Sequence, residues 1–183
     1  MRLSSALVTI AVGALAPWST RAAEWELLSV GVRAQVWEQR VLGKEQPESF
    51  NEYDLVAAMR MPWDGPSFWG FEVNTRLLAS AGVLQGADKT AFVASAIPAL
   101  AFIRRDVPVT VEFGAGLALI SEHRYGGQDY GGPLQFALTF SVGVPLYKRV
   151  GIAYRFMHYS DASAYGSDTI GADLHMLELT YNF

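Results

Sequence analysis

The sequence lacks the features of several common classes of protein. It contains no cysteine, so neither a disulfide framework nor thiolate chemistry is available. No apolar run of about 18 residues is present, which argues against a transmembrane helix. The net charge is −4 without a basic stripe, so nucleic acid is not an expected partner. What is present is a chain that is 51% hydrophobic and 13% aromatic, which is unusual for an exported soluble protein.

The first residues predict a secretory signal peptide. Arg2 gives a positive start, and residues 7–16 form an apolar run too short to span a bilayer. Thr20-Arg21-Ala22 places small residues at the −3 and −1 positions of a cleavage site. We therefore predict a signal peptide over residues 1–22 and, from the length of the remainder, a single domain over 23–183.

After the leader, eight segments alternate between apolar and polar residues, which predicts β-strands. Their expected ranges are 26–37, 52–62, 67–82, 90–104, 108–121, 133–145, 149–160 and 173–183. Lysine is nearly absent from the polar faces, which carry arginine, glutamate, asparagine and glycine. This pattern fits a narrow barrel with paired charges inside and apolar faces in contact with lipid. We expect the interior charges to include Arg33, Arg60, Arg76, Arg155, Asp54, Glu72, Glu112 and Glu178.

The spacing between these segments alternates as well. Long loops are expected at 38–51, 83–89, 122–132 and 161–172, and tight turns at 63–66, 105–107 and 146–148. Long outer loops and short periplasmic turns are typical of outer-membrane barrels. The predicted fold class is therefore all-β, an eight-stranded antiparallel transmembrane β-barrel of the outer-membrane type, with its lumen filled by side chains. Pro98, inside the fourth segment, predicts a bulge or local distortion.

Residues able to perform ester chemistry lie at the expected outer end of the seventh segment. His158 and Ser160 are two residues apart, so in a strand they share a face, here the lipid-facing one. The same parity along the eighth segment places Asp173 and His175 beside them. A serine nucleophile, a histidine base and an orienting carboxylate suit hydrolysis of a lipid ester. The alternative is that an interfacial histidine and a serine at a strand end lie two residues apart by chance.

The run Tyr154-Arg-Phe-Met-His-Tyr-Ser-Asp-Ala162, followed by Gly171-Ala-Asp173 and an aromatic C-terminal end, resembles the lipid A 3-O-deacylases of the PagL type, also labelled acyloxyacyl hydrolases. The resemblance implies an eight-stranded barrel in the outer membrane of a Gram-negative bacterium. It implies hydrolysis of the ester-linked acyl chain at position 3 of lipid A, with Ser160 as nucleophile, His158 as base and Asp173 as acid. The implied partner is lipid A or lipopolysaccharide of the outer leaflet, and a homodimer is compatible with it.

The site departs from the family's usual pattern. The family usually has glutamate where Asp173 stands, and the spacing from Ser160 to this acid is one residue longer here than usual. The family's motif usually reads His-x-Ser-Asn-Ala, in which the asparagine helps to stabilise the oxyanion. Asp161 replaces that asparagine here. Asp161 and Ala162 are thus the candidate residues beside the oxyanion, with the backbone amides of 162–166 as alternative donors.

Further candidates and alternatives remain at this stage. Phe156, Tyr159 and His175 are candidate substrate contacts, with a girdle position as the alternative for His175. The three histidines lie in separate segments without ligand spacing, so neither a metal nor a dissociable cofactor is expected. The glycine-rich residues 126–132 predict a flexible outer loop. Two other functions fit the barrel: a non-enzymatic or inactive protein of adhesion or envelope stability, and an outer-membrane phospholipase.

Overall fold

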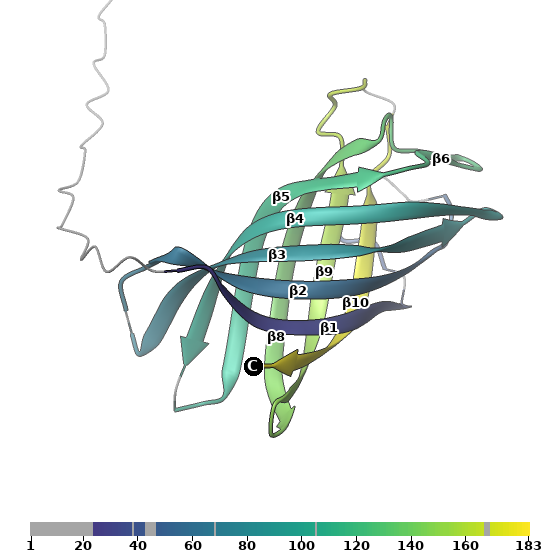
Figure 1. Cartoon of the computed structure of the whole chain (residues 1–183). Coiled ribbons are helices and arrows are strands. Elements are labelled where there is room, and N and C mark those ends of the chain that lie inside the picture. The colour runs from purple at the N-terminus through teal and green to yellow at the C-terminus, as the bar shows by residue number, and fades with distance from the viewer. Residues whose placement is uncertain (1–23, 38, 43–46, 68, 105, 167–168) are drawn as a thin grey trace, which may run out of the picture.

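The computed structural model describes residues 24–37, 39–42, 47–67, 69–104, 106–166 and 169–183. Eight strands close into an antiparallel barrel (Figure 1). They are β1 (Glu26–Trp37), β2 (Phe50–Asp64), β3 (Phe71–Gly86), β4 (Lys89–Arg104), β5 (Val109–Ile120), β8 (Leu134–Tyr147), β9 (Val150–Ser160) and β10 (Ala172–Asn182). The predicted fold class is confirmed, whereas the predicted signal peptide lies outside the described residues.

The barrel closes through pairing of the first and last strands. Val32 on β1 lies opposite Leu55 on β2 and opposite Leu179 on β10. Each of the eight strands therefore has a partner on both sides, and closure removes the exposed edges that would otherwise pair with other chains. Among the described residues, no helix is long and apolar enough to cross a bilayer.

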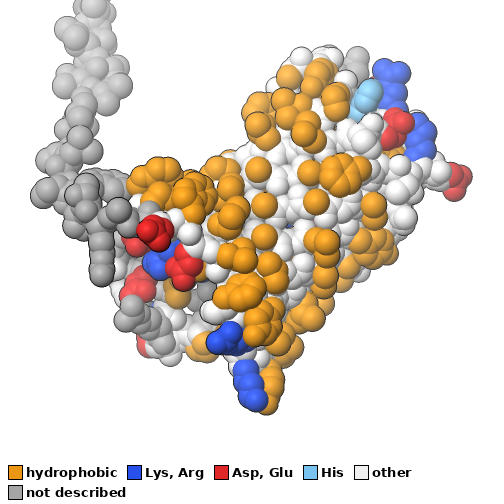
Figure 2. Space-filling view, in the orientation of Figure 1, with side chains coloured by type: hydrophobic (Ala, Val, Ile, Leu, Met, Phe, Trp, Pro, Cys, Tyr) orange, Lys and Arg blue, Asp and Glu red, His pale blue; other side chains and the backbone are white. Residues whose placement is uncertain are grey.

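Apolar side chains cover the outside of this barrel and charged ones occupy its interior. Val32, Leu55 and Leu179 are exposed, whereas Arg33 and Asp54, their chain neighbours, are buried. Figure 2 shows hydrophobic side chains spread over the strands, with charged side chains gathered toward the ends of the barrel. This arrangement inverts that of a water-soluble protein and matches a barrel surrounded by lipid.

Most of the predicted interior charges form ion pairs within the barrel, whereas Arg60 is partly exposed and pairs with the exposed Asp64 at the end of β2. Arg33 Nε lies 2.6 Å from Asp54 Oδ2, and Arg76 Nη1 lies 2.5 Å from Glu112 Oε1. Arg155 joins two carboxylates at 2.8 Å each, Glu112 through Nη2 and Glu178 through Nε. Pairing of this kind is required because an isolated charge in a dry interior costs several kcal/mol, about the stability of a small domain.

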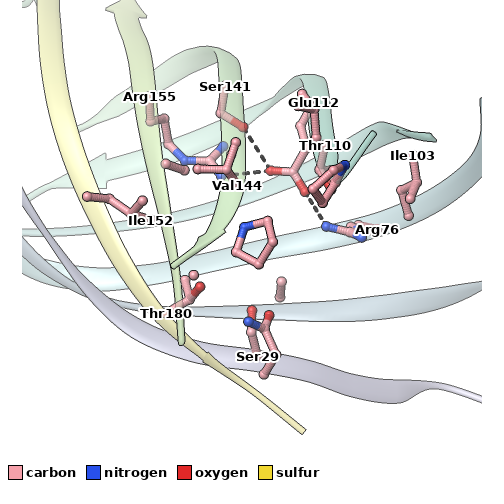
Figure 3. Close-up of a pocket in the computed structure, with 18 of the residues that line it drawn as sticks. Ser29, Arg76, Ile103, Thr110, Glu112, Ser141, Val144, Ile152, Arg155 and Thr180 are labelled. Atoms are coloured by element: carbon pink, nitrogen blue, oxygen red, sulfur yellow. Dashed lines mark hydrogen bonds and ion pairs between the residues drawn. The ribbon is translucent and has the colours of Figure 1, made fainter. Parts of the chain in front are cut away.

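The two ends of the lumen differ. Toward the outer loops it is filled by fully buried side chains, including Phe50, Tyr125, Tyr130, Tyr159 and Met157. At the end with the short turns it contains a cavity of about 270 Å³ (Figure 3). This cavity is lined by Ser29, Ala58, Arg76, Leu78, Ile103, Arg104, Pro108, Val109, Thr110, Glu112, Ser141, Gly143, Val144, Pro145, Gly151, Ile152, Ala153, Arg155, Thr180 and Asn182. It exists because many of the inward side chains there are small.

The connection between β3 and β4 differs from the prediction. Residues 83–89 were expected to form a long loop, but β3 continues to Gly86 and β4 begins at Lys89. Ala87 and Asp88 make a two-residue turn with φ values of 45° and 61°. Two successive positive φ values match the twist of a tight β-hairpin, so both strands continue to the turn.

Pro98 also behaves differently from the expected bulge. It lies opposite Leu77 of β3 in an uninterrupted ladder. The pairing of β4 with β5 skips two residues between Ala96 and Ala99 and resumes without a change of register. The missing N–H of proline thus interrupts one ladder locally, without inserting an extra residue.

The glycine-rich segment between β5 and β8 is not an open loop. It forms a small hairpin from β6 (Arg124–Tyr125) and β7 (Gln128–Asp129). Tyr125 and Gln128 of this hairpin are buried. The segment predicted as a flexible loop therefore packs onto the outer end of the barrel.

Candidate active site

Strands β9 and β10 bring the predicted catalytic residues together. His158 lies directly opposite Asp173 in their antiparallel ladder. Arg155, whose side chain lies in the lumen, is on the other face of β9, because side chains alternate along a strand. This alternation predicts that His158 and Ser160 lie on the face turned away from the lumen.

The His158 and Asp173 side chains are hydrogen-bonded and largely buried. His158 Nδ1 lies 2.6 Å from Asp173 Oδ1. The other carboxylate oxygen, Oδ2, accepts hydrogen bonds from the amides of Val41 at 2.5 Å and Leu42 at 2.6 Å. An acceptor on Nδ1 places the proton of a neutral imidazole there and leaves Nε2 able to accept one. This is the tautomer that a general base requires.

Ser160 ends β9 near the imidazole, where both residues lie close to the backbone of Gly171. A Cβ atom added to Gly171 would lie 3.3 Å from His158 Cε1 and 3.4 Å from Ser160 Cβ. The Gly171 carbonyl accepts a hydrogen bond from Gln128 Nε2 at 2.8 Å, which fixes the backbone at this point. Within the described residues, Ser160 Oγ forms no hydrogen bond to His158. Such bonds often tighten only in the substrate complex.

The Asp161 carboxylate points into its own loop. Its oxygens accept hydrogen bonds from the amides of Ser163 and Tyr165 at 3.0 Å and from the Thr169 hydroxyl at 2.8 Å. Burial raises the pKa of Asp161, but these hydrogen bonds outweigh it, so the pKa lies below the ordinary aspartate value. The carboxylate therefore organises the loop.

The loop should consequently loosen in acid. A depressed pKa means that the ionised form of Asp161 stabilises the folded loop above about pH 4, and this stabilisation is lost as the pH falls through the lowered value. Hydrogen exchange of the Ser163 and Tyr165 amides, compared between pH 7 and pH 3, should show faster opening only at the lower pH. Asp161→Asn should show faster opening already at pH 7, because its NH₂ group opposes one of the donors. Equal protection in both proteins at pH 7 would contradict this role.

The predicted substrate contacts occupy different environments. Tyr159 faces the lumen, is fully buried and donates a hydrogen bond to Glu52 at 2.9 Å. A substrate contact does not fit that position, because Tyr159 lies between two residues of the opposite face. Phe156 shares the face of His158 and lies 5.4 Å from the ring of His175. His175 is buried, with both ring nitrogens engaged by protein groups.

Taken together, these residues can perform acyl transfer. A hydroxyl, an imidazole with a free Nε2 and a hydrogen-bonded carboxylate are the parts of a nucleophile activated by a general base. The described residues include no group of three or more histidine, cysteine or acidic side chains placed to hold a metal ion. Exposed apolar side chains flank the site, Phe136 opposite Ser160 and Leu138 opposite His158 on β8.

Comparison with known proteins decides the family. The family described as "Lipid A 3-O-deacylase (PagL)" matches residues 51–182, most of the chain and all of the strands from β3 to β10. The chain belongs to the lipid A 3-O-deacylase (PagL) family. Membership supports a hydrolase acting on lipid A, and with the barrel fold it indicates a protein of the Gram-negative outer membrane.

A solved structure supports the fold of this lipid A 3-O-deacylase family member. It is titled "Crystal structure of the outer membrane enzyme PagL" and superposes with a TM-score of 0.68 at 18% sequence identity. The match covers 85% of this chain and 99% of that one. No curated protein matches the sequence.

Two parts of the site were not anticipated from the sequence. One is the pair of amides at Val41 and Leu42, which bind Asp173 from the loop between β1 and β2. The other is Gln128, which holds the backbone at Ile170 and Gly171. Backbone amides leave no sequence signal. For the contact made by Gln128, the sequence signal was a glutamine within the glycine-rich segment.

Proposed function

We propose that the chain is a serine esterase that removes an ester-linked acyl chain, at position 3, from lipid A in the outer leaflet. The observation that carries the proposal is the hydrogen bond between His158 and Asp173 beside Ser160, in a chain of this family. The face turned away from the lumen is the one that contacts lipid in a membrane barrel, so the ester reaches these residues from the bilayer.

The reaction follows from the atoms of the site. Ser160 Oγ attacks the ester carbonyl carbon while its proton passes to His158 Nε2. The tetrahedral intermediate then expels the sugar hydroxyl, which takes the proton back from His158, and the acyl chain remains on Ser160. Water, deprotonated by His158, attacks this ester; the second tetrahedral intermediate expels Ser160 Oγ, which takes the proton back from His158, and the fatty acid is released. Asp173 accepts the Nδ1–H bond throughout and stabilises the imidazolium that forms twice in each cycle.

Ala162 supplies the oxyanion donor in this proposal. Within the loop, the amides of Ser163 and Tyr165 bind the Asp161 carboxylate, and the amide of Ala164 binds the Asp161 carbonyl. The Ala162 amide lies two residues after the nucleophile and is not used by these bonds. A backbone donor of this kind is typically worth about 10²- to 10³-fold in rate.

The function is tested by mass spectrometry of lipid A from Gram-negative cells expressing the protein. The wild type is expected to produce lipid A lighter by one ester-linked acyl chain, and Ser160→Ala, at matched amounts of folded barrel, is expected to leave it intact. Unchanged lipid A with the wild type would overturn the proposal. Fatty acid released only from glycerophospholipids would identify a phospholipase instead.

The close packing around Gly171 gives a sharper test of the site. Gly171→Ala would place its Cβ too close to the Tyr159 carbonyl oxygen and against His158 and Ser160. We expect deacylation to fall about 10²-fold, the usual cost of displacing reacting groups by about 1 Å. Gly127→Ala is the matched control, because a Cβ there would meet only side-chain atoms of Pro47 and Glu48 at 3.6 Å, which is ordinary van der Waals contact. Equal activity of the Gly171 variant and the wild type would contradict the assigned geometry.

A further inference from the structure

His175 lies next to the proposed catalytic residues but is held on every side by protein groups. It follows Asp173 by two residues on β10, so the two side chains share a face. Tyr154 Oη lies 2.7 Å from His175 Nδ1, and His175 Nε2 lies 2.6 Å from the carbonyl oxygen of Gln39. A carbonyl only accepts, so Nε2–H donates to Gln39 and Nδ1 accepts from the tyrosine hydroxyl.

Aromatic rings fix the plane of the His175 imidazole. Trp37 stacks on it with ring centroids 5.4 Å apart and planes inclined by 19°, and Tyr154 stacks at 6.1 Å and 26°. Only 4% of the residue is exposed. Both ring nitrogens have protein partners and the residue is buried, so neither nitrogen of His175 is left to bind a substrate phosphate.

The partner of His175 belongs to the same short segment that binds Asp173. We define residues 39–42 as the strap. Its Gln39 carbonyl is bound by His175, and its Val41 and Leu42 amides are bound by Asp173. The strap is therefore held at both ends by residues two positions apart on β10. Asp173, through its other oxygen, binds His158.

We propose that His175 is a positioning residue: it holds the strap at Gln39 so that the amides of Val41 and Leu42 orient the Asp173 carboxylate toward His158. This inference rests on the proposed function for its kinetic consequence, but the tether itself does not depend on it. Without the tether, the strap amides leave Asp173, and the carboxylate loses two of the donors that fix its rotamer. His158 then spends less time in the orientation and tautomer that Ser160 needs.

Kinetics separate positioning from substrate binding. His175→Phe keeps a ring for stacking and removes the donor, whereas His175→Gln restores an N–H at a similar reach. With purified protein and lipid A in mixed micelles, we expect the phenylalanine variant to lose about 10- to 10²-fold in kcat with little change in KM, and the glutamine variant to recover most of it. In the Asp173→Asn background, His175→Phe should lower kcat no further, because His175 acts through the Asp173 carboxylate. A raised KM with unchanged kcat, or no effect at all, would overturn the proposal.

Proteolysis tests the tether without reference to catalysis. The peptide bond after Arg40 contains the Val41 amide that Asp173 binds, so an arginine-specific protease can cut there only when the strap is released. We expect at least tenfold faster cleavage at this bond, identified by fragment mass, in His175→Phe than in the wild type or His175→Gln. Equal cleavage rates would overturn the proposal. Faster cleavage in a protein whose wild type does not deacylate lipid A would show that the tether exists and that the proposed function is wrong.

Discussion

Asp173→Asn is expected to lower kcat by about 10³- to 10⁴-fold while the barrel stays folded. The reason lies in the two strap amides, which require an acceptor on one side of residue 173. The asparagine oxygen will turn toward them, and its NH₂ group will then face His158 Nδ1. This donor forces the imidazole into the tautomer with its proton on Nε2, which cannot take the proton of Ser160.

The measurement is kcat and KM for lipid A deacylation, with mobility of the unheated protein on a gel as the test of folding. Asp173→Glu is the matched control, because it keeps the carboxylate and lengthens it by one methylene. We expect it to retain far more activity than the asparagine variant. If the asparagine variant has a kcat near the wild-type value, Asp173 is not the acid of the site.

Arg155→Met is expected to lower the free energy of unfolding by about 3–5 kcal/mol. Arg155 binds Glu178, Glu112 and the Thr139 hydroxyl in the lumen, and it is almost completely buried. Its removal leaves Glu178 without this partner and Glu112 with Arg76 and Ser141 alone. Most of this destabilisation comes from leaving a carboxylate charge unpaired in a dry interior, and less of it comes from losing the attraction between the two charges.

Urea-induced unfolding in lipid vesicles, followed by tryptophan fluorescence, measures this effect. Arg104→Met serves as the control, because Arg104 pairs with Asp106 on the exposed surface at the end of the barrel, and little change is expected. Combining Arg155→Met with Glu178→Gln should recover part of the loss, since the stranded charge is removed. A double variant no more stable than Arg155→Met alone would contradict the explanation.

The sequence predicted the barrel well because alternation along a strand has a strict period of two. Counting residues at that period predicted Arg155 in the lumen and His158 on the opposite face, and it predicted that His158 and Asp173 lie within reach of each other on neighbouring strands, where the ladder pairs them. These predictions depend only on local chain geometry. The turn at Ala87 and Asp88 was missed because these two residues are not typical of a tight hairpin turn, as Asn-Gly is.

The surroundings of the site could not be predicted from the sequence, for a different reason. The direction of the Asp161 carboxylate depends on where the loop places the amides of Ser163 and Tyr165, and the strap depends on the path of the chain after β1. Periodicity carries no information about either. The Glu52 carboxylate, which accepts a hydrogen bond from Tyr159 in the lumen, was overlooked because it lies at the boundary of the predicted second strand.

The filled outer half of the lumen determines how the proposed site responds to the bilayer. Met157, Tyr159 and Leu174, all fully buried, lie directly behind His158 and Asp173 on the same two strands. A close-packed interior is nearly incompressible. Lateral pressure or a change in bilayer thickness will therefore be taken up by the end of the barrel that contains the cavity. The spacing of the two residues is thus insulated from the membrane's mechanical state, and deacylation should respond to what lipid is present rather than to how tightly the lipids are packed.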